Sequence, residues 1–487
     1  MSYDEAIARL REAAVAACRS GSLDARRSLL VQAGQFEQGV RDLGLPVPVE
    51  DVTDAASRGF LGRASPRSVL DALDALPAWA ASLTIKEPEG FAFYTLYPEA
   101  YVSAARQWLS EHPDAGRVLV VGLRSIGTTL SAVVAEVVGA RRVTVRPSGH
   151  PFAREADLDT RGAEWVLVVD EGPGLSGSSM AAVAAAAHRC GVPADRIAFF
   201  PGHGGEPGRE ANDEVRRWWS STRRYVGSVG GLDLALASET TRLTGIPVVA
   251  VEDASAGRWR SFAYADGGPL PPVAATFERT KRLVRLQNGA AVLWKFAGLT
   301  HTADADYERQ CELASKGWTP APIGRHWGFV GTPWIEGRRM LSGGADPERL
   351  GRYIKDAARP PLSATEAEEA IGRLREMMTV NLGIEPPTIQ PRVDLPSYAD
   401  GRMGPHEWLA NGMKTDVVGH DHDHTVIGRQ SILWDLAGAA LEWDLSESQV
   451  DRMVRTASVV VGAEEIAFYV AGYRAFQAGI RHYNGDC

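Results

Sequence analysis

Short apolar runs alternate with helix-type segments between residues 117 and 203, and this rhythm constrains the fold more than any other feature of the chain. The runs read RVLVVG, RRVTVRP, EWVLVVD and RIAFFPG, and the segments between them include TTLSAVVAEVV and SSMAAVAAAAHRC. Strands that are apolar on both faces and separated by helices are typical of a parallel sheet covered on both sides. We therefore predict an α/β domain in this part of the chain.

The length of the chain limits the number of its domains, and its charge and cysteine pattern exclude some classes of function. With 487 residues it is expected to form two or three domains, because a domain usually spans roughly 100 to 200 residues. The formal net charge of −9 argues against nucleic acid as a partner, since binding a phosphate backbone requires clustered Lys and Arg. The four cysteines include no CxxC pair, and the most apolar stretch, residues 118–140, is interrupted by Arg124 and Glu136. We predict a cytoplasmic protein without a membrane span, a disulfide framework or a structural zinc site.

Changes in pattern along the chain predict three regions. Residues 1–82 carry apolar side chains at helical spacing, and we expect a helical region that caps the next domain or forms a homodimer contact. The α/β pattern indicates a domain over residues 83–265, and a Gly- and Pro-rich linker follows it. Residues 278–487 begin with two apolar runs joined at Asn288-Gly289, a hairpin signal, and continue with helices. The expected fold class is α/β with an N-terminal helical region, followed by an α+β domain.

The third apolar run ends in two adjacent acids, Asp170 and Glu171, and a Gly-rich loop follows them. Glycines permit a tight turn into a helix, where backbone amides and hydroxyl groups can bind a phosphate. Carboxylates beside such a loop suit a sugar phosphate, because the acids can accept the ribose hydroxyls while the loop holds the 5-phosphate. The candidate phosphate-binding residues are Gly174, Ser176, Gly177, Ser178 and Ser179.

The segment VLVVDEGPGLSGSSM resembles the signature of the type I phosphoribosyltransferases, with a loop that is one residue longer before Gly177. The resemblance implies a fold that binds phosphoribosyl diphosphate with Mg²⁺ and transfers its phosphoribosyl group to a small-molecule acceptor. It implies that Asp170 and Glu171 are catalytic residues that hold the ribose.

A second element, VVGLRSIGTT, is similar to the loop that binds diphosphate in the same family. The resemblance implies that Arg124, Ser125, Gly127 and Thr128 bind the diphosphate. The family places a mobile loop between the two elements. There Arg146 is a candidate catalytic residue that stabilises the departing diphosphate, with His150 and Arg154 as further candidates, or all three are solvated loop residues.

Residues 278–487 resemble, in order and spacing, the kinase-like phosphotransferases of the aminoglycoside and choline kinase kind. Lys295 follows the predicted hairpin at the place of the lysine that binds ATP phosphates in that family. Glu308 or Glu312 on the next helix would pair with it. The resemblance implies ATP and Mg²⁺ as cofactors, and an adenine-binding backbone near residues 334–337.

The catalytic region of such a kinase would begin at Asp416, which fits the catalytic base, and end at Asp435, which follows the apolar run SILW and fits a metal ligand. A run of alternating His and Asp stands where the family has a metal-binding Asn. Asp421, Asp423 and His424 are the candidates for its role. Alternatively, the three histidines of the run share one face of a strand and hold a transition metal.

These features together predict a transferase in which a phosphoribosyltransferase is fused to an ATP-dependent small-molecule kinase module. One alternative hypothesis is a ligand-sensing protein without catalytic activity. Another is a metal-dependent hydrolase that uses the alternating His and Asp run.

Overall fold

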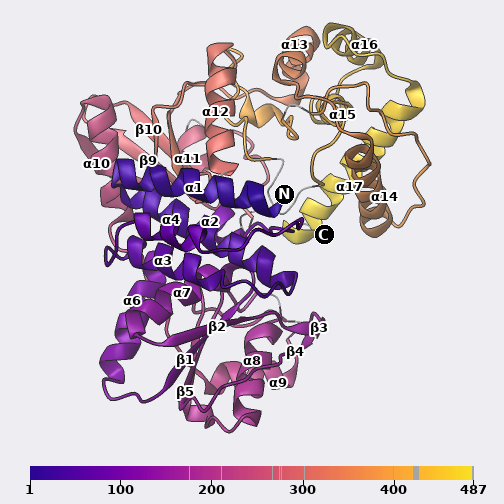
Figure 1. The fold of residues 1–487 in the computed structure, drawn as a ribbon. Coiled ribbons are helices and arrows are strands. Elements are labelled where there is room, and N and C mark those ends of the chain that lie inside the picture. Colours follow the sequence, from indigo (N-terminus) through magenta and orange to yellow (C-terminus); the bar gives the residue numbers. More distant parts are fainter. Residues whose placement is uncertain are drawn as a thin grey trace. The chain divides into compact units, whose positions relative to one another are not determined.

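The computed structural model describes residues 1–174, 176–209, 211–265, 267–273, 275, 277–300, 302–398, 400–420 and 427–484. The chain divides into two compact units, each with its own sheet and its own buried core (Figure 1). The first unit comprises Met1–Leu232 and Gly298–Ala303, and the second comprises Asp233–Ala297 and Asp304–Cys487. Along the described chain, no helix is both long enough and apolar enough to cross a membrane.

The first unit begins with helices and continues with alternating strands and helices. The helices are α1 (Tyr3–Ser20), α2 (Leu23–Asp42), α3 (Glu50–Phe60), α4 (Arg67–Asp74), α5 (Glu89–Ala92), α6 (Pro98–Glu111), α7 (Ile126–Val138), α8 (Ser178–Arg189) and α9 (Asp213–Ser221). The strands are β1 (Val118–Leu123), β2 (Arg141–Val145), β3 (Ser148–His150), β4 (Ala153–Glu155), β5 (Trp165–Val169), β6 (Ile197–Phe200) and β7 (Arg223–Arg224). The predicted helical start of the chain is confirmed.

The main sheet of the first unit has the strand order β2-β1-β5-β6-β7, and all neighbours pair in parallel. Side chains alternate along β1, so that Leu119 and Val121 pack in the core with α8. Gly122 faces α7 so closely that a Cβ atom there would lie 2.3 Å from the carbonyl oxygen of Gly127. The predicted parallel sheet with helices on both faces is confirmed.

Helix α7 is buried along nearly its whole length, because α2, α3 and α6 pack on the side that faces away from the sheet. This position explains why its sequence is apolar on every face. Gly34 of α2 and Thr129 of α7 meet where a Cβ atom on Gly34 would lie 1.9 Å from the Thr129 Oγ1 atom. The N-terminal helices therefore complete the core of the α/β region and belong to one unit with it, whereas we predicted a separate region.

The second unit combines an antiparallel sheet with a helical part. Its strands are β8 (Val248–Asp253), β9 (Lys281–Leu286), β10 (Ala291–Phe296), β11 (Gly324–His326) and β12 (Phe329–Pro333). Its helices are α10 (Leu232–Thr244), α11 (Trp259–Ala263), α12 (Thr302–Ser315), α13 (Pro347–Ala357), α14 (Ala364–Leu382), α15 (Leu433–Glu442), α16 (Glu447–Thr456) and α17 (Ala463–Asn484).

The sheet of the second unit has the order β11-β12-β10-β9-β8, with antiparallel neighbours. The predicted hairpin is β9–β10, and Gly289 has a φ of 84° at its turn. Strand β8 pairs with β9, so residues 254–280 connect two strands of one sheet. We predicted that residues 265–277 are a linker and that the second domain begins at residue 278. The structure places the division near Asp233, because β8 joins the second sheet through a long-range pairing that no local pattern indicates.

Aromatic side chains hold the helical part of the second unit together and support the loops that carry the site. The rings of Trp434 on α15 and Tyr473 on α17 lie 4.8 Å apart. The rings of Tyr353 on α13 and Trp408 lie 5.0 Å apart and meet edge to face. Trp408 is the first paired residue of the hairpin that leads to the candidate site, so the packed rings fix where this hairpin begins.

Candidate functional site

Two lysines face each other on neighbouring strands of the second unit. Lys281 on β9 and Lys295 on β10 are direct partners in the antiparallel register, and both line one cavity together with Arg279. Lys281 is 9% exposed. Burial lowers its pKa, and the charge of Lys295 adds to this, although Glu278 opposes both effects. The Lys281 ammonium group pairs with Glu278 at 2.5 Å, and two ammonium groups on one wall of a cavity are suited to an anionic ligand.

The cavity in the second unit has a volume of about 210 Å³. Its walls come from the sheet, from the connection between β8 and β9, and from the chain between α14 and α15. Trp259, Leu293, Trp334 and Ile335 supply apolar surface. A cavity with apolar walls and several converging charged groups is typical of a small-molecule site.

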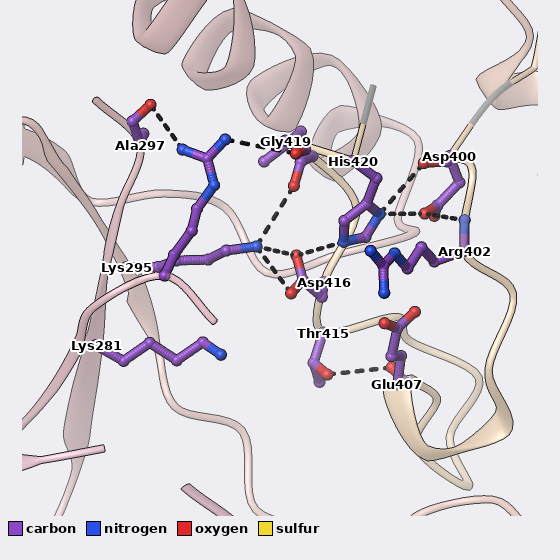
Figure 2. Close-up of polar contacts among 12 residues, drawn as sticks. Lys281, Lys295, Ala297, Asp400, Arg402, Glu407, Thr415, Asp416, Gly419 and His420 are labelled. Carbon is purple, nitrogen blue, oxygen red and sulfur yellow. Dashed lines mark hydrogen bonds and ion pairs between the residues drawn. The ribbon is translucent and has the colours of Figure 1, made fainter. Parts of the chain in front are cut away.

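Asp416 lies at the cavity directly after a short hairpin, in which Trp408 pairs with Lys414 and the backbone N–H of Leu409 donates to Met413. The Lys295 ammonium group donates to both carboxylate oxygens of Asp416, at 2.6 and 2.8 Å (Figure 2). Burial disfavours the Asp416 anion, but the charges of Lys295 and His420 hold the pKa of this carboxyl well below its usual range.

His420 lies between two carboxylates. Its Nδ1 atom is 2.8 Å from Oδ1 of Asp400, and its Nε2 atom is 3.6 Å from Oδ1 of Asp416 (Figure 2). Burial disfavours its charge, but Asp416 and Asp400 outweigh burial and raise the pKa of His420 to about 9. The ring is therefore an imidazolium at neutral pH.

Lys414 anchors the loops beneath the cavity. Its side chain is fully buried, and its ammonium group pairs with Asp400 at 2.8 Å and with Glu407. The Tyr353 hydroxyl also donates to Asp400. Because each of these buried charges has an opposite partner, the network fixes the loop from Asp400 to Glu407 against the segment that leads to Asp416.

Two carboxylates at this point could hold a metal ion, and His420 would join them only after losing a ring proton. One ligand atom each from Glu407, Asp416 and His420 lie within 4.8 Å of one another. The two carboxylates match the oxygen ligands that Mg²⁺ prefers. Asp416 was predicted as a catalytic base, yet its depressed pKa and its two cationic partners suit a metal ligand better, because a base needs a pKa near the working pH.

The expected helix partner of Lys295 differs in the structure. Glu308 and Glu312 lie on the exposed face of α12, and Glu312 pairs with Arg309 and Lys316 at 2.7 Å each. The buried face carries Asp306 and Gln310 instead, which line a smaller cavity beside Lys295 and Asp416. Their helical spacing with the buried Leu313 was the sequence signal that could have identified this face.

Asp435 is not placed as the predicted metal ligand. We expected a strand before it, but Leu433–Glu442 is helix α15, and Asp435 has no exposed surface. Its carboxylate accepts the backbone N–H groups of Asp400 and Gly401, at 3.0 and 2.8 Å. Asp435 thus holds the backbone of the loop beneath the cavity.

Three predicted metal ligands lie in a part of the chain that the structure does not describe, whereas the predicted adenine-binding segment lies at the cavity. Asp421, Asp423 and His424 lie outside the described residues, so the transition-metal and hydrolase hypotheses that depend on them stay predictions. Near the predicted adenine site, Trp334 and Ile335 line the cavity, and the N–H of Trp334 donates to the carbonyl of Ala291 at 2.9 Å.

In the first unit, the candidate residues meet where the strand order reverses. The loops after β1 and β5 lie side by side at the carboxyl edge of the sheet, and β2 and β6 extend from them in opposite directions. Ligands of open α/β sheets bind at such a switch point. Arg124 follows β1, and Asp170 and Glu171 follow β5, so the structure brings these predicted residues to one edge.

Both carboxyl groups of the acid pair in the first unit have pKa values raised toward neutral pH. Burial raises the pKa of Asp170 to about 7. Burial and the charge of Asp170 raise the pKa of Glu171 to about 8, although the N–H of Gly90 donates to its carboxylate at 3.1 Å. A cation or a set of hydroxyl donors beside the pair would favour its charged form.

We expect the stability of the first unit to fall as the pH rises from about 4 to about 8. Unfolded Asp and Glu titrate near pH 4, whereas the folded pair retains protons up to its raised pKa values. The folded state thus binds more protons, and the stability present at low pH is lost as the pH passes through the folded pKa values. Thermal melting of wild type and the Asp170→Asn/Glu171→Gln variant in metal-free buffer measures this. Equal pH slopes for the two proteins would contradict it.

Both predicted arginines of the first unit bind an acid that the sequence did not indicate. Asp42, the last residue of α2, accepts from Arg146 at 2.7 and 2.5 Å, and its carboxylate lies 2.9 Å from Nε of Arg124. Burial opposes the charge of Asp42, but hydrogen bonds from Arg146 and Gln38 and the charges of both arginines lower its pKa. Asp42 therefore supplies the negative charge between the two guanidinium groups that we expected from a diphosphate.

The other predicted phosphate-binding residues divide into packed and accessible ones. Gly127 packs against the backbone of β5, Thr128 has no exposed surface, and the Ser178 hydroxyl donates to the carbonyl of Pro151. Gly177 has a φ of 62° and packs against Pro207 and Val215. The hydroxyl groups of Thr128 and Ser178 are therefore buried, which corrects the prediction that they face a ligand. Ser125, Gly174, Ser176 and Ser179 retain exposed surface at the same edge.

Solved structures that are similar to this chain share little sequence identity with it and have low TM-scores. No protein-family model and no curated protein matches the chain. The solved macrolide 2′-phosphotransferase MphH of Brachybacterium faecium is similar over 52% of this chain and 95% of its own, with 10% identity and a TM-score of 0.32. Choline kinase LicA of Streptococcus pneumoniae is similar over 53% and 92%, with 14% identity and a TM-score of 0.33. The APRTase of Giardia lamblia with 9-deazaadenine is similar over 25% and 74%, with 18% identity and a TM-score of 0.17. At these scores, function has to be argued from the chain's own residues.

Proposed function

We propose that the second unit binds a nucleoside triphosphate with Mg²⁺ and transfers its terminal phosphoryl group to a small molecule. The observation that carries this proposal is the cross-strand pair of Lys281 and Lys295, which faces a cavity that also holds Asp416. Lys281 pairs with Glu278 at 2.5 Å and Lys295 pairs with Asp416 at 2.6 Å, and a polyphosphate between the two ammonium groups would replace these carboxylates as their partner.

Each part of the cavity fits one part of such a ligand. Lys281 and Lys295 on the sheet would bind phosphate oxygens, and Asp416 with Glu407 would hold Mg²⁺, which neutralises charge on the transferring phosphoryl group. Trp334 and its neighbouring backbone at the end of β12 would face the base. The Lys295–Asp416 ion pair would then be exchanged for contacts of each partner with the bound nucleotide and its metal ion.

Removing the two lysines tests this proposal. We expect the Lys281→Met/Lys295→Met variant to bind Mg²⁺-ATP at least about 100-fold more weakly than wild type, because each of the two charge-assisted contacts contributes about 1.5 kcal/mol or more. Calorimetric titration measures the affinity, and circular dichroism checks the fold. Lys355→Met is the matched control, since Lys355 lies exposed on α13. Unchanged affinity in the double variant, or no ATP binding by wild type, would refute a nucleotide site here.

We propose as a second function that the first unit binds phosphoribosyl diphosphate and transfers its phosphoribosyl group. The supporting observation is that Asp170 and Glu171 share the switch point with Arg124. The two carboxyl groups would take the ribose hydroxyls, and Ser176 and Ser179 with nearby amides would take the 5-phosphate. The diphosphate would compete with Asp42 for the guanidinium groups.

Titration of phosphoribosyl diphosphate with Mg²⁺ tests this second function. We expect binding by wild type and a loss of at least tenfold in affinity in the Asp170→Asn/Glu171→Gln variant, because the neutral side chains cannot accept as strongly from the ribose hydroxyls. The Lys281→Met/Lys295→Met variant is the control and should bind like wild type. Binding that is equal in all three proteins would place the ligand outside the predicted site.

A further inference from the structure

We infer that the cavity of the second unit takes a second substrate with an anionic group, a phosphate or a carboxylate, and that Arg339 and Arg402 bind this group. The inference rests on the proposed function of that unit, since it concerns the molecule that lies beside the nucleotide. It is carried by a buried guanidinium at the cavity and by the charge balance of the cavity walls.

Arg339 is a buried cation in the wall of the cavity. Its side chain lines the cavity, it is 8% exposed, and its Nε atom has no hydrogen-bond partner. Its Nη1 atom donates to the hydroxyl group of Thr415 at 2.6 Å, and Thr415 directly precedes Asp416 in the chain. The group lies over the ring of Trp334, with 5.8 Å from Cζ to the ring centroid. An unsatisfied buried N–H costs free energy, and an anion in the cavity would supply its acceptor.

Arg402 approaches the same cavity from another segment. It follows the loop residues whose backbone Asp435 holds, and it lines the cavity. Figure 2 shows its guanidinium group extending toward Asp416 and His420, on the side opposite Lys295 in that view. Each of the two guanidinium groups offers a planar set of N–H donors that suits phosphate or carboxylate, and both line the same cavity.

The positively charged side chains that line the cavity outnumber the two lysines proposed to bind the nucleotide. Among the described lining residues, five Lys and Arg side chains stand against three carboxylates. Lys281 and Lys295 lie opposite each other on β9 and β10, the two strands that are proposed to hold the nucleotide. Arg339 and Arg402 line the cavity from segments outside the sheet, apart from the two strands proposed to hold the nucleotide. They would offset the repulsion between an anionic substrate and the terminal phosphate, and they would repel a cationic one.

A matched series of probes tests the inference. We would titrate ribose 5-phosphate, ribonate, ribose and choline into the full-length protein, with and without saturating AMP-PNP and Mg²⁺. We expect an anionic probe to bind to the nucleotide-loaded protein, and the better of the first two identifies phosphate or carboxylate as the recognised group. Ribose and choline should bind at least tenfold more weakly.

Three variants assign the binding to the two arginines. Arg339→Gln and Arg402→Gln should each weaken the anionic probe at least tenfold and change AMP-PNP affinity less than twofold, whereas Arg402→Lys should restore part of the loss. Because the first unit is identical in all these proteins, any binding of ribose 5-phosphate there cancels in the comparison. Circular dichroism and the retained AMP-PNP affinity show that the variants are folded.

The outcomes separate the inference from the proposed function. Equal binding of ribose, choline and the anions, or anion binding that neither Gln variant weakens, would overturn the anion subsite. Absence of anion binding by wild type in both conditions would overturn it as well. Failure of AMP-PNP to bind would refute the nucleotide site, and the series without nucleotide would then decide the anion subsite alone.

Discussion

The Asp416→Asn variant is expected to lose Mg²⁺-dependent turnover of ATP by about 100- to 1,000-fold, the loss typical when a group that stabilises transition-state charge is removed. Asp416 is the acid that lies closest to Lys295, at 2.6 Å, and it shares the metal-capable cluster with Glu407. Asn keeps the size of the side chain but removes the charge that would hold the metal ion. The measurement is the rate of ADP release at increasing Mg²⁺ concentration.

Asp451→Asn is the matched control for this experiment, because Asp451 lies exposed on α16, and it should turn over ATP at the wild-type rate. Calorimetry with ATP in the absence of Mg²⁺ should show Asp416→Asn binding at least as well as wild type, since Lys295 has lost a competing partner. A variant that keeps the full Mg²⁺ dependence would show that the metal ion binds elsewhere.

The Asp435→Ala variant is expected to lower the free energy of unfolding of the second unit by about 4 kcal/mol, although Asp435 touches none of the proposed ligands. Its fully buried carboxylate accepts two backbone N–H groups, from Asp400 and Gly401. The substitution would leave both donors without an acceptor inside the core and would release the loop beneath Asp416. Urea denaturation followed by circular dichroism measures the shift in the midpoint of the second unit's transition.

The exposed Asp451→Ala change should alter stability by less than about 0.5 kcal/mol and serves as the control. Asp435→Asn should give an intermediate loss, because the amide oxygen still accepts one N–H group. A stable Asp435→Ala protein that loses only Mg²⁺ affinity would support the metal-ligand role that the sequence had predicted for Asp435.

Local patterns were enough to predict most of the elements. The runs that became β1, β5 and β6 are apolar on both faces, so only a parallel sheet covered on both sides can bury them. The acid pair Asp170 and Glu171 was predicted for the same reason, since residues that directly follow a buried strand must emerge at the sheet edge. Lys295 and Asp416 were also identified from order and spacing, and the structure places them within 2.6 Å.

Partners far apart in the sequence could not be predicted. Asp42 lies 104 residues before Arg146 and nevertheless pairs with it, and the pairing of β8 with β9 moved the unit boundary. Glu308 or Glu312 was predicted to pair with Lys295, but the packing of α12 buries the face that carries Asp306. Asp435 was assigned to metal because it follows the apolar run SILW, and no local pattern indicates that its carboxylate accepts backbone N–H groups.

The sequence by itself determined the strand and helix segments and the chemical groups that follow them, because backbone preferences and apolar periodicity act over a few residues. Tertiary structure alone decided which charges face each other: Lys281 with Lys295, Asp42 with Arg124 and Arg146, and Asp435 with the loop backbone. The physical reason is that pairing and burial set the electrostatic free energy of a charged group. Both depend on packing between segments that are distant in the chain.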